Sequence, residues 1–135
     1  MALELYMLGL IVQDMGKSLA FYRRLGLDIP EGSEEMTHVQ VKMGGGLTFF
    51  LDSRPTRWDP GYARRDDQGR IGASDSYPSI LEFYLKSRDA VEAKYAELTG
   101  FGYHGHRAPY ETSFGMCFAL INDPDGNTIL LSGDL

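Results

Sequence analysis

The stretch that decides the fold is Phe114-Gly115-Met116-Cys117-Phe118-Ala119-Leu120-Ile121-Asn122-Asp123-Pro124-Asp125-Gly126-Asn127-Thr128-Ile129-Leu130-Leu131. Two apolar runs rich in β-favouring residues flank the central Asp-Pro-Asp-Gly-Asn. Proline presets the first torsion angle of a turn, aspartates bond to the local backbone, and Gly126 supplies the positive φ that closes the turn. The stretch therefore predicts a β-hairpin.

The first 52 residues predict a strand, a helix and three further strands. Residues 2–12 are apolar and typical of a strand. Asp14 is a typical helix N-cap, apolar residues then recur at helical spacing, and Gly26 is expected to end the helix. Short strands are expected at residues 27–30, 37–43 and 47–51. The first module is thus predicted as β-α-β-β-β.

The second half shows the same order of patterns. A strand is expected at residues 79–85, and Ser87 caps a helix that Gly100 ends. Short strands near residues 102–106, 114–121 and 128–131 complete a second β-α-β-β-β module.

The two halves repeat each other at a fixed offset. Asp14 matches Ser87 and Tyr22 matches Tyr95, since 87 − 14 and 95 − 22 both give 73. A unit this small leaves one sheet face exposed, and two such units can curl their sheets around a shared cleft. We therefore predict an α+β fold of two tandem modules, residues 1–52 and 78–135, that together form one structural domain.

Residues 53–77, between the modules, form a polar linker. It carries Trp58, the only tryptophan of the chain. The linker is too long for a simple connection inside a compact domain, so it is either disordered or functional, for example as a lid.

Composition narrows the class of protein. A chain of 135 residues with a formal net charge of −6 disfavours nucleic acid and anionic membranes as partners. The charge indicates either a cationic partner or simply a solvated acidic surface. Cys117 is the single cysteine, which excludes an intrachain disulfide, and its apolar strand predicts a buried thiol. No apolar run approaches membrane-spanning length, and we expect a cytoplasmic protein.

The C-terminal stretch also resembles a known family. A Phe-Gly pair, an apolar strand, Asp-Pro-Asp-Gly-Asn and a second apolar strand are similar to the end of a vicinal oxygen chelate domain. That superfamily includes glyoxalase I, bleomycin-resistance proteins, fosfomycin-resistance enzymes and extradiol dioxygenases. The resemblance covers nearly the whole chain apart from the linker, and it implies curved mixed sheets that form a cleft.

The resemblance implies a divalent metal in the cleft, held by His and Glu side chains. The positions of those ligands are occupied here by Met7, Ile80 and Leu130. None of these side chains offers the nitrogen or oxygen donors that Mg²⁺, Mn²⁺ or Zn²⁺ require. We therefore predict that the protein binds no metal and no other cofactor.

Strand alternation predicts what lines the cleft instead. If Met7 and Ile80 face inward, the inner wall is apolar and aromatic with one carboxylate, that of Glu82. Such a wall suits an organic ligand with flat apolar area, although the same residues could simply fill a closed sheet. A buried Glu82 would attract a cationic group, unless it pairs with Arg or Lys or lies solvated at the rim. The predicted ligand-binding residues are Met7, Phe50, Trp58, Ile80, Glu82, Tyr84 and Leu130.

The three histidines give weaker signals. His104 and His106 are spaced to share one face of a strand and so to chelate a metal, but no acidic residue flanks them. His38 alternates with Gln40 and Lys42, and this pattern favours a solvated strand face.

The sequence is compatible with two functions. The first is a metal-free binding protein similar to the bleomycin-resistance branch, whose members are acidic homodimers that sequester a bulky, often cationic aromatic antibiotic. We therefore expect a homodimer. The second is a glyoxalase-type lyase, isomerase or dioxygenase that uses Glu82 as general base, with Tyr84 or a histidine as the acid. The lost metal ligands favour the first.

Overall fold

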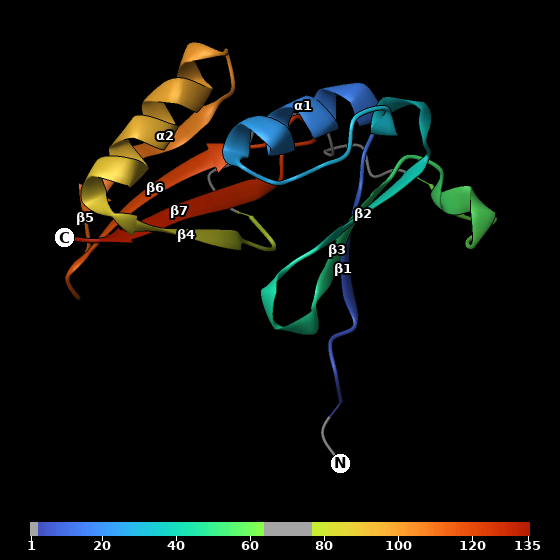
Figure 1. The fold of residues 1–135 in the computed structure, drawn as a ribbon, viewed down its shortest axis with the longest axis horizontal. Coiled ribbons are helices and arrows are strands. Elements are labelled where there is room, and N and C mark those ends of the chain that lie inside the picture. Colours follow the sequence, from blue (N-terminus) through green and yellow to red (C-terminus); the bar gives the residue numbers. More distant parts are fainter. Residues whose placement is uncertain (1–2, 64–76) are drawn as a thin grey trace. The chain divides into compact units, whose positions relative to one another are not determined.

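The chain divides into two compact units, Met1–Arg65 (unit 1) and Asp66–Leu135 (unit 2). The structure is a computed structural model that describes residues 3–63 and 77–135 (Figure 1). The division falls inside the predicted linker, whose residues 64–76 lie outside the described part of the chain.

Unit 1 is a helix on a three-stranded sheet. Strand β1 (Met7–Ile11) runs parallel to β3 (Thr48–Asp52), and β2 (His38–Lys42) pairs antiparallel with the other edge of β3. The order across the sheet is therefore β1-β3-β2. The helix is α1 (Met15–Leu25). Three short 3₁₀ turns complete the unit: η1 (Ser33–Glu35) follows α1, η2 (Gly44–Gly46) follows β2, and η3 (Pro55–Arg57) follows β3.

Helix α1 begins and ends where the sequence predicts. The Asp14 carboxylate accepts a hydrogen bond from the Lys17 amide at 3.0 Å, and Gly26 adopts φ 129° at the C-cap. The helix buries Leu19 and Tyr22 completely, and the Tyr22 ring meets Phe49 of β3 at 5.4 Å between centroids. One face of the sheet in unit 1 is thereby covered by its helix.

The expected strand at residues 27–30 does not form, so the first module has three strands rather than four. Side chains satisfy the backbone carbonyls of this segment instead of a sheet ladder. Arg23 donates to the Ile29 and Pro30 carbonyls, and the Ser33 hydroxyl also donates to the Pro30 carbonyl. Proline has no N–H to offer a neighbouring strand, which further disfavours the pairing.

Unit 2 is a helix on a four-stranded sheet in the order β4-β7-β6-β5 (Figure 1). Helix α2 (Arg88–Gly100) is capped by Ser87, whose hydroxyl accepts from the Ala90 amide. The helix buries Val91 and Leu98. The strands are β4 (Leu81–Ser87), β5 (Gly105–Glu111), β6 (Met116–Asn122) and β7 (Thr128–Asp134).

Strands β4 and β5, like β6, begin later than predicted. The strand expected at residues 79–85 is β4, which pairs with β7 only from Leu81. The strand expected at residues 102–106 is β5, which pairs with β6 from Gly105 onward. Residues just before β5 are held by other contacts, since the His104 ring bonds to the Asn122 side chain at 2.8 Å.

The hairpin between β6 and β7 confirms the turn predicted from Asp-Pro-Asp-Gly-Asn. The buried Asp123 carboxylate accepts from the amides of Asp125 and Asn127 at 3.0 and 2.8 Å, and Gly126 has φ 88°. The strands then pair antiparallel from Asn122 and Thr128. Cys117 is buried in β6 as predicted, and burial raises the pKa of its thiol.

The duplication is confirmed in the pairing of the strands. Leu8 pairs with Phe49 in the parallel β1–β3 ladder. In unit 2, Leu81 matches Leu8 at the offset of 73 (81 − 8), and Ile129 matches Phe49 at the offset of 80 that overlays the hairpin strands (129 − 49). These two residues pair in the parallel β4–β7 ladder. The two units thus share the same strand register, which places matched side chains on matched faces.

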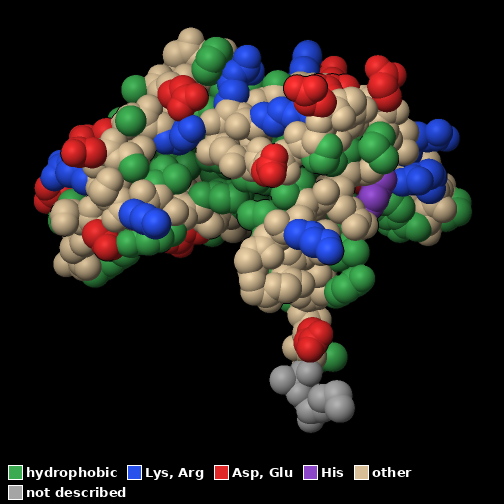
Figure 2. Space-filling model, in the orientation of Figure 1, with side chains coloured by type: hydrophobic (Ala, Val, Ile, Leu, Met, Phe, Trp, Pro, Cys, Tyr) green, Lys and Arg blue, Asp and Glu red, His purple; other side chains and the backbone are tan. Residues whose placement is uncertain are grey.

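Helices long and apolar enough to cross a membrane are absent from the described residues. On the surface drawn in Figure 2, acidic and basic side chains lie among one another rather than in one patch.

Candidate functional site

Each sheet has one face against its helix and one face away from it. In unit 1 the face away from the helix is here called the unit 1 face. Strands β1 and β3 contribute to it three pairs of residues, Met7 with Thr48, Gly9 with Phe50 and Ile11 with Asp52. Strand β2 adds the side chains opposite these on β3, namely His38, Gln40 and Lys42.

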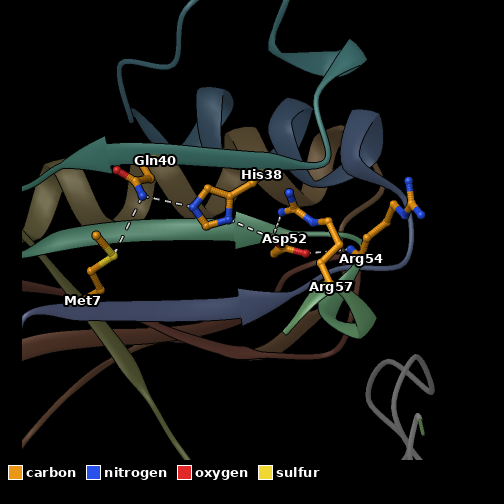
Figure 3. A network of polar contacts seen from close by, with 6 residues as sticks. All are labelled: Met7, His38, Gln40, Asp52, Arg54 and Arg57. Carbon is orange, nitrogen blue, oxygen red and sulfur yellow. Dashed lines mark hydrogen bonds and ion pairs between the residues drawn. The ribbon is translucent and has the colours of Figure 1, made fainter. Parts of the chain in front are cut away.

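Asp52 organises the polar end of the unit 1 face (Figure 3). Its side chain is fully buried, and it accepts hydrogen bonds from the Arg54 amide at 2.6 Å, Arg57 Nη2 at 2.9 Å and His38 Nδ1 at 2.7 Å. Burial alone would raise the pKa of Asp52, but these three donors outweigh it, and the pKa lies below its ordinary value. Asp52 is therefore a carboxylate at neutral pH, and it holds the start of the linker against the sheet.

His38 is oriented by this carboxylate. Because an ionised carboxylate only accepts, Nδ1 of His38 carries the proton in the bond to Asp52. The other ring nitrogen, Nε2, lies 3.0 Å from the amide nitrogen of Gln40, which in this orientation donates to it. The same amide nitrogen lies 3.9 Å from the sulfur of Met7 (Figure 3). The arrangement fits a neutral imidazole with its Nε2 lone pair directed at an exposed amide.

Phe50 provides the apolar floor of the unit 1 face. A Cβ atom at Gly9 would lie only 1.9 Å from the Phe50 ring, so the ring covers the backbone of β1 at this glycine. On its other side the ring lies 4.9 Å from the His38 ring, tilted by 34°. The glycine therefore allows a half-buried aromatic ring to extend from β1 to His38.

Reasoning from the sequence missed this network. The alternation of His38 with Gln40 and Lys42 correctly placed them on one strand face, but β2–β3 pairing turns that face to the side of Met7 and Phe50. Asp52 was placed at the end of the first module and was not selected as a site residue, although it continues the alternation of Thr48 and Phe50 along β3. That period of two was the available signal for Asp52.

The corresponding face of unit 2, here called the unit 2 face, is aromatic. One row across the sheet pairs Tyr84 with Ser132, Ser132 with Phe118, and Phe118 with Tyr110. The next row pairs Glu82 with the buried Leu130. Three of the predicted ligand-binding residues, Glu82, Tyr84 and Leu130, are thereby brought together on one face.

Glu82 takes the solvated alternative that the sequence left open. It is exposed, and it accepts a hydrogen bond from the Ser132 hydroxyl at 2.8 Å. It is also not the only acidic residue on these faces, because Asp52 lies on the unit 1 face and Asp134 on the unit 2 face. The exposed Asp134 accepts from the Tyr84 hydroxyl at 2.7 Å, and this bond raises the pKa of Tyr84.

Aromatic rings that the sequence analysis did not select extend the unit 2 face. The Phe118 ring meets Tyr110 and Phe114 edge to face, with centroids 6.2 and 5.6 Å apart. The guanidinium of Arg107 lies over the Tyr110 ring, 3.6 Å from its centroid. This face already holds a cation against an aromatic ring.

The remaining predicted residues take different places. Met7 and Phe50 are half-buried on the unit 1 face. Ile80 lies just before β4 and is 43 % exposed, and Trp58 lies just after η3 and is 54 % exposed. Trp58 is thus outside the sheet, on the ordered turn that Asp52 anchors.

The chemistry of the chain does not fit the family's metal. Met7 and Leu130, on the two sheet faces, offer no hard donor, and Ile80 offers none either. Among residues 3–63 and 77–135, no three His, Cys, Asp or Glu side chains form a group that could hold an ion. His104 instead bonds to Asn122, and His106 meets the Tyr77 ring at 5.8 Å.

Residues 5–131 match the Glyoxalase/Bleomycin resistance protein/Dioxygenase superfamily. The chain belongs to this superfamily, which confirms the resemblance inferred from the sequence.

Solved structures show the same fold. A glyoxalase-related enzyme from Fulvimarina pelagi is 16% identical with a TM-score of 0.75, over 97% of this chain and 88% of that one. A glyoxalase/bleomycin resistance protein/dioxygenase family enzyme from Burkholderia phytofirmans PsJN is 17% identical with a TM-score of 0.74, over 98% and 100%. At such identities the likeness shows the fold alone. No curated protein matches the chain.

Proposed function

We propose that the unit 2 face binds a small organic cation with a flat aromatic part, and that the protein sequesters this ligand without chemistry. The observation that carries the proposal is the row Tyr84–Ser132–Phe118–Tyr110, flanked by the exposed carboxylates of Glu82 and Asp134. Aromatic rings offer flat apolar area, and carboxylates beside them favour a positive charge over a negative one.

Two further features support a cationic ligand. The stacking of Arg107 on Tyr110 provides an example, within the chain itself, of a delocalised cation on this aromatic row. The formal net charge of −6 also favours the approach of cations over anions. The absence of hard donors at Met7, Ile80 and Leu130 supports binding rather than metal-dependent catalysis.

The other predicted contacts, Met7, Phe50 and Trp58 in unit 1 and Ile80 just before β4, stay predictions and are not part of this row. We also propose that the protein acts as a homodimer, because two-fold dimers are the commonest assembly of small soluble domains. Light scattering at working concentration tests the assembly, and a mass equal to that of one chain contradicts it.

A matched pair of probes tests the binding proposal. N-methylacridinium carries a permanent charge, whereas acridine has nearly the same shape and is uncharged at pH 8. Isothermal titration calorimetry should show tighter binding of the cation. The Glu82→Gln variant should bind it about fivefold more weakly, the effect expected for one solvent-exposed charge, and should bind acridine unchanged.

A control variant separates local from general electrostatics. Glu92 lies on α2, against the other face of the sheet, so Glu92→Gln makes the same change in net charge away from the aromatic row. It should leave the affinity for both probes unchanged. Equal binding of the two probes, or equal losses in the two variants, would overturn the proposal.

A further inference from the structure

The unit 1 face carries an acid–base group that the proposed function does not use. His38 comes from β2, Asp52 from the end of β3 and Arg57 from the turn η3, so three elements meet at the Asp52 carboxylate (Figure 3). The Asp52 Oδ2 atom receives both His38 Nδ1 and Arg57 Nη2. Because the buried carboxylate only accepts, the bond from Nδ1 holds the imidazole ring in one orientation and one tautomer.

The second nitrogen of His38 points to the exposed part of the face. The imidazole is 30 % exposed, and the partner of Nε2 is the exposed side chain of Gln40. Within residues 3–63 and 77–135, the other contact of the Gln40 side chain is the weak one to the Met7 sulfur. A ligand can therefore replace the contact between the amide and the imidazole at small cost.

We propose that His38 and Gln40 form a binding site for a weakly acidic hydroxyl group, a phenol or an enol, on a flat ligand. The hydroxyl oxygen accepts from the Gln40 amide while its proton is donated to His38 Nε2. The two nitrogens lie 3.0 Å apart, and the exposed Gln40 side chain can rotate to admit one oxygen atom between them.

The proton transfer at this site balances without any other reactant. The O–H bond of the ligand breaks, its electron pair stays on oxygen, and a new N–H bond forms at Nε2. The products are an imidazolium, stabilised by the Asp52 carboxylate, and an oxyanion that keeps the hydrogen bond from Gln40. The charged groups that face the imidazole are Asp52 from β3 and Arg57 from η3, and Lys42 shares the face of β2.

The neighbouring side chains determine the class of ligand. The Phe50 ring beside His38 offers a flat apolar surface, and the Met7 sulfur adjoins Gln40. An aromatic or conjugated hydroxyl compound matches an apolar floor beside one acceptor and one donor. This ligand differs in charge from the organic cation proposed for the unit 2 face, so the two proposals stand or fall separately.

The test uses 4-nitrophenol, whose visible absorbance reports its ionisation, and 4-nitroanisole, which has the same ring without the hydroxyl proton. Wild-type protein should bind 4-nitrophenol and increase its ionised fraction at a pH below the probe's own pKa. The His38→Gln variant should lose at least about tenfold in affinity, as expected for a charge-assisted hydrogen bond, together with the spectral shift.

The control makes the same substitution at a histidine of the other unit. His106→Gln removes an imidazole that meets Tyr77 and should change neither affinity nor spectrum. Nitrogen-15 spectra of wild-type His38 add a readout that needs no variant: Nδ1 should carry the proton, and the Nε2 resonance should move when 4-nitrophenol is added.

Three results would overturn the proposal: equal affinity for 4-nitrophenol and 4-nitroanisole, unchanged binding in His38→Gln, or an Nε2 resonance that does not respond to the probe. In each case His38 would serve only to join β2 to Asp52. None of these results bears on the affinity for N-methylacridinium, which tests the unit 2 face.

Discussion

The two units of this chain pair their strands in the same register but carry different chemistry on matched faces. In unit 1 the row Ile11–Asp52–His38 crosses the sheet. The positions that the repeat matches to it in unit 2 form the row Tyr84–Ser132–Phe118. One row holds a buried carboxylate and an imidazole, and the other holds two aromatic rings on either side of a hydroxyl.

A second matched pair shows the same divergence. Gly9 pairs with Phe50 in unit 1, and the ring covers the glycine. Glu82 pairs with Leu130 in unit 2, and the carboxylate stays exposed. Residues that face the helix must remain apolar to form the core, so they preserve the register, whereas the other face is free to change its chemistry.

The largest expected effect distinguishes Asp52 from its counterpart Ser132. Asp52→Ala leaves the Arg54 amide and His38 without their buried acceptor, and it should lower the free energy of unfolding by about 3 kcal/mol. Ser132→Ala removes one bond to an exposed carboxylate and should cost about 1 kcal/mol. Urea denaturation measures both, and equal losses would contradict the different roles of the two positions.

The contribution of Asp52 to the free energy of unfolding should depend on pH. Because the pKa of Asp52 is lowered in the folded state, its stabilising contribution is complete above the ordinary carboxyl value of 3.8 and is lost as the pH falls further. Asp52→Asn should remove this part of the acid dependence, and Ser132→Ala should retain it. Urea unfolding curves recorded at several pH values between about 2 and 6 measure how the free energy of unfolding depends on pH in each variant.

The next effect concerns the glycine under Phe50. Gly9→Val places a branched side chain where the Phe50 ring lies, and it should cost about 2 kcal/mol and move the ring away from His38. Gly44→Ala is the control, since a Cβ there meets nothing within 4 Å, and it should change stability by less than about 0.5 kcal/mol. Thermal unfolding and the aromatic proton spectrum report the two changes. An unshifted Phe50 resonance in Gly9→Val would contradict the close approach.

The smallest effect concerns the exposed phenol of unit 2. The bond from Tyr84 to Asp134 raises the pKa of the tyrosine, so Tyr84 should ionise at a higher pH in wild type than in Asp134→Asn. Stability near neutral pH should hardly change, because the pair is exposed. NMR titration of the tyrosine ring measures the pKa, and an unchanged midpoint would show that the two groups do not interact in solution.

The fold was largely predictable because caps and turns are local. Asp14, Gly26, Ser87 and the Asp123–Asn127 turn each act through neighbours a few residues away, and all four appear as predicted. The absence of a strand at residues 27–30 was not predicted, because the apolar pattern does not show that the side chains of Arg23 and Ser33 satisfy the carbonyls of this segment.

The site was only partly predictable, because its chemistry depends on pairing across strands. Alternation along single strands was enough to bring together Glu82, Tyr84 and Leu130. It could not show that His38 faces Asp52, since that contact joins two strands through a register that the sequence does not state. The contact between Glu82 and Ser132 also joins two strands through their register, since the two residues lie 50 residues apart in the chain.

The most direct test of two faces with different chemistry is a calorimetric titration of N-methylacridinium into wild type, Glu82→Gln and His38→Gln under one buffer. Glu82→Gln should weaken binding about fivefold, and His38→Gln should leave it unchanged. Equal weakening in the two variants, or no weakening in Glu82→Gln, would contradict the assignment of the cation to unit 2.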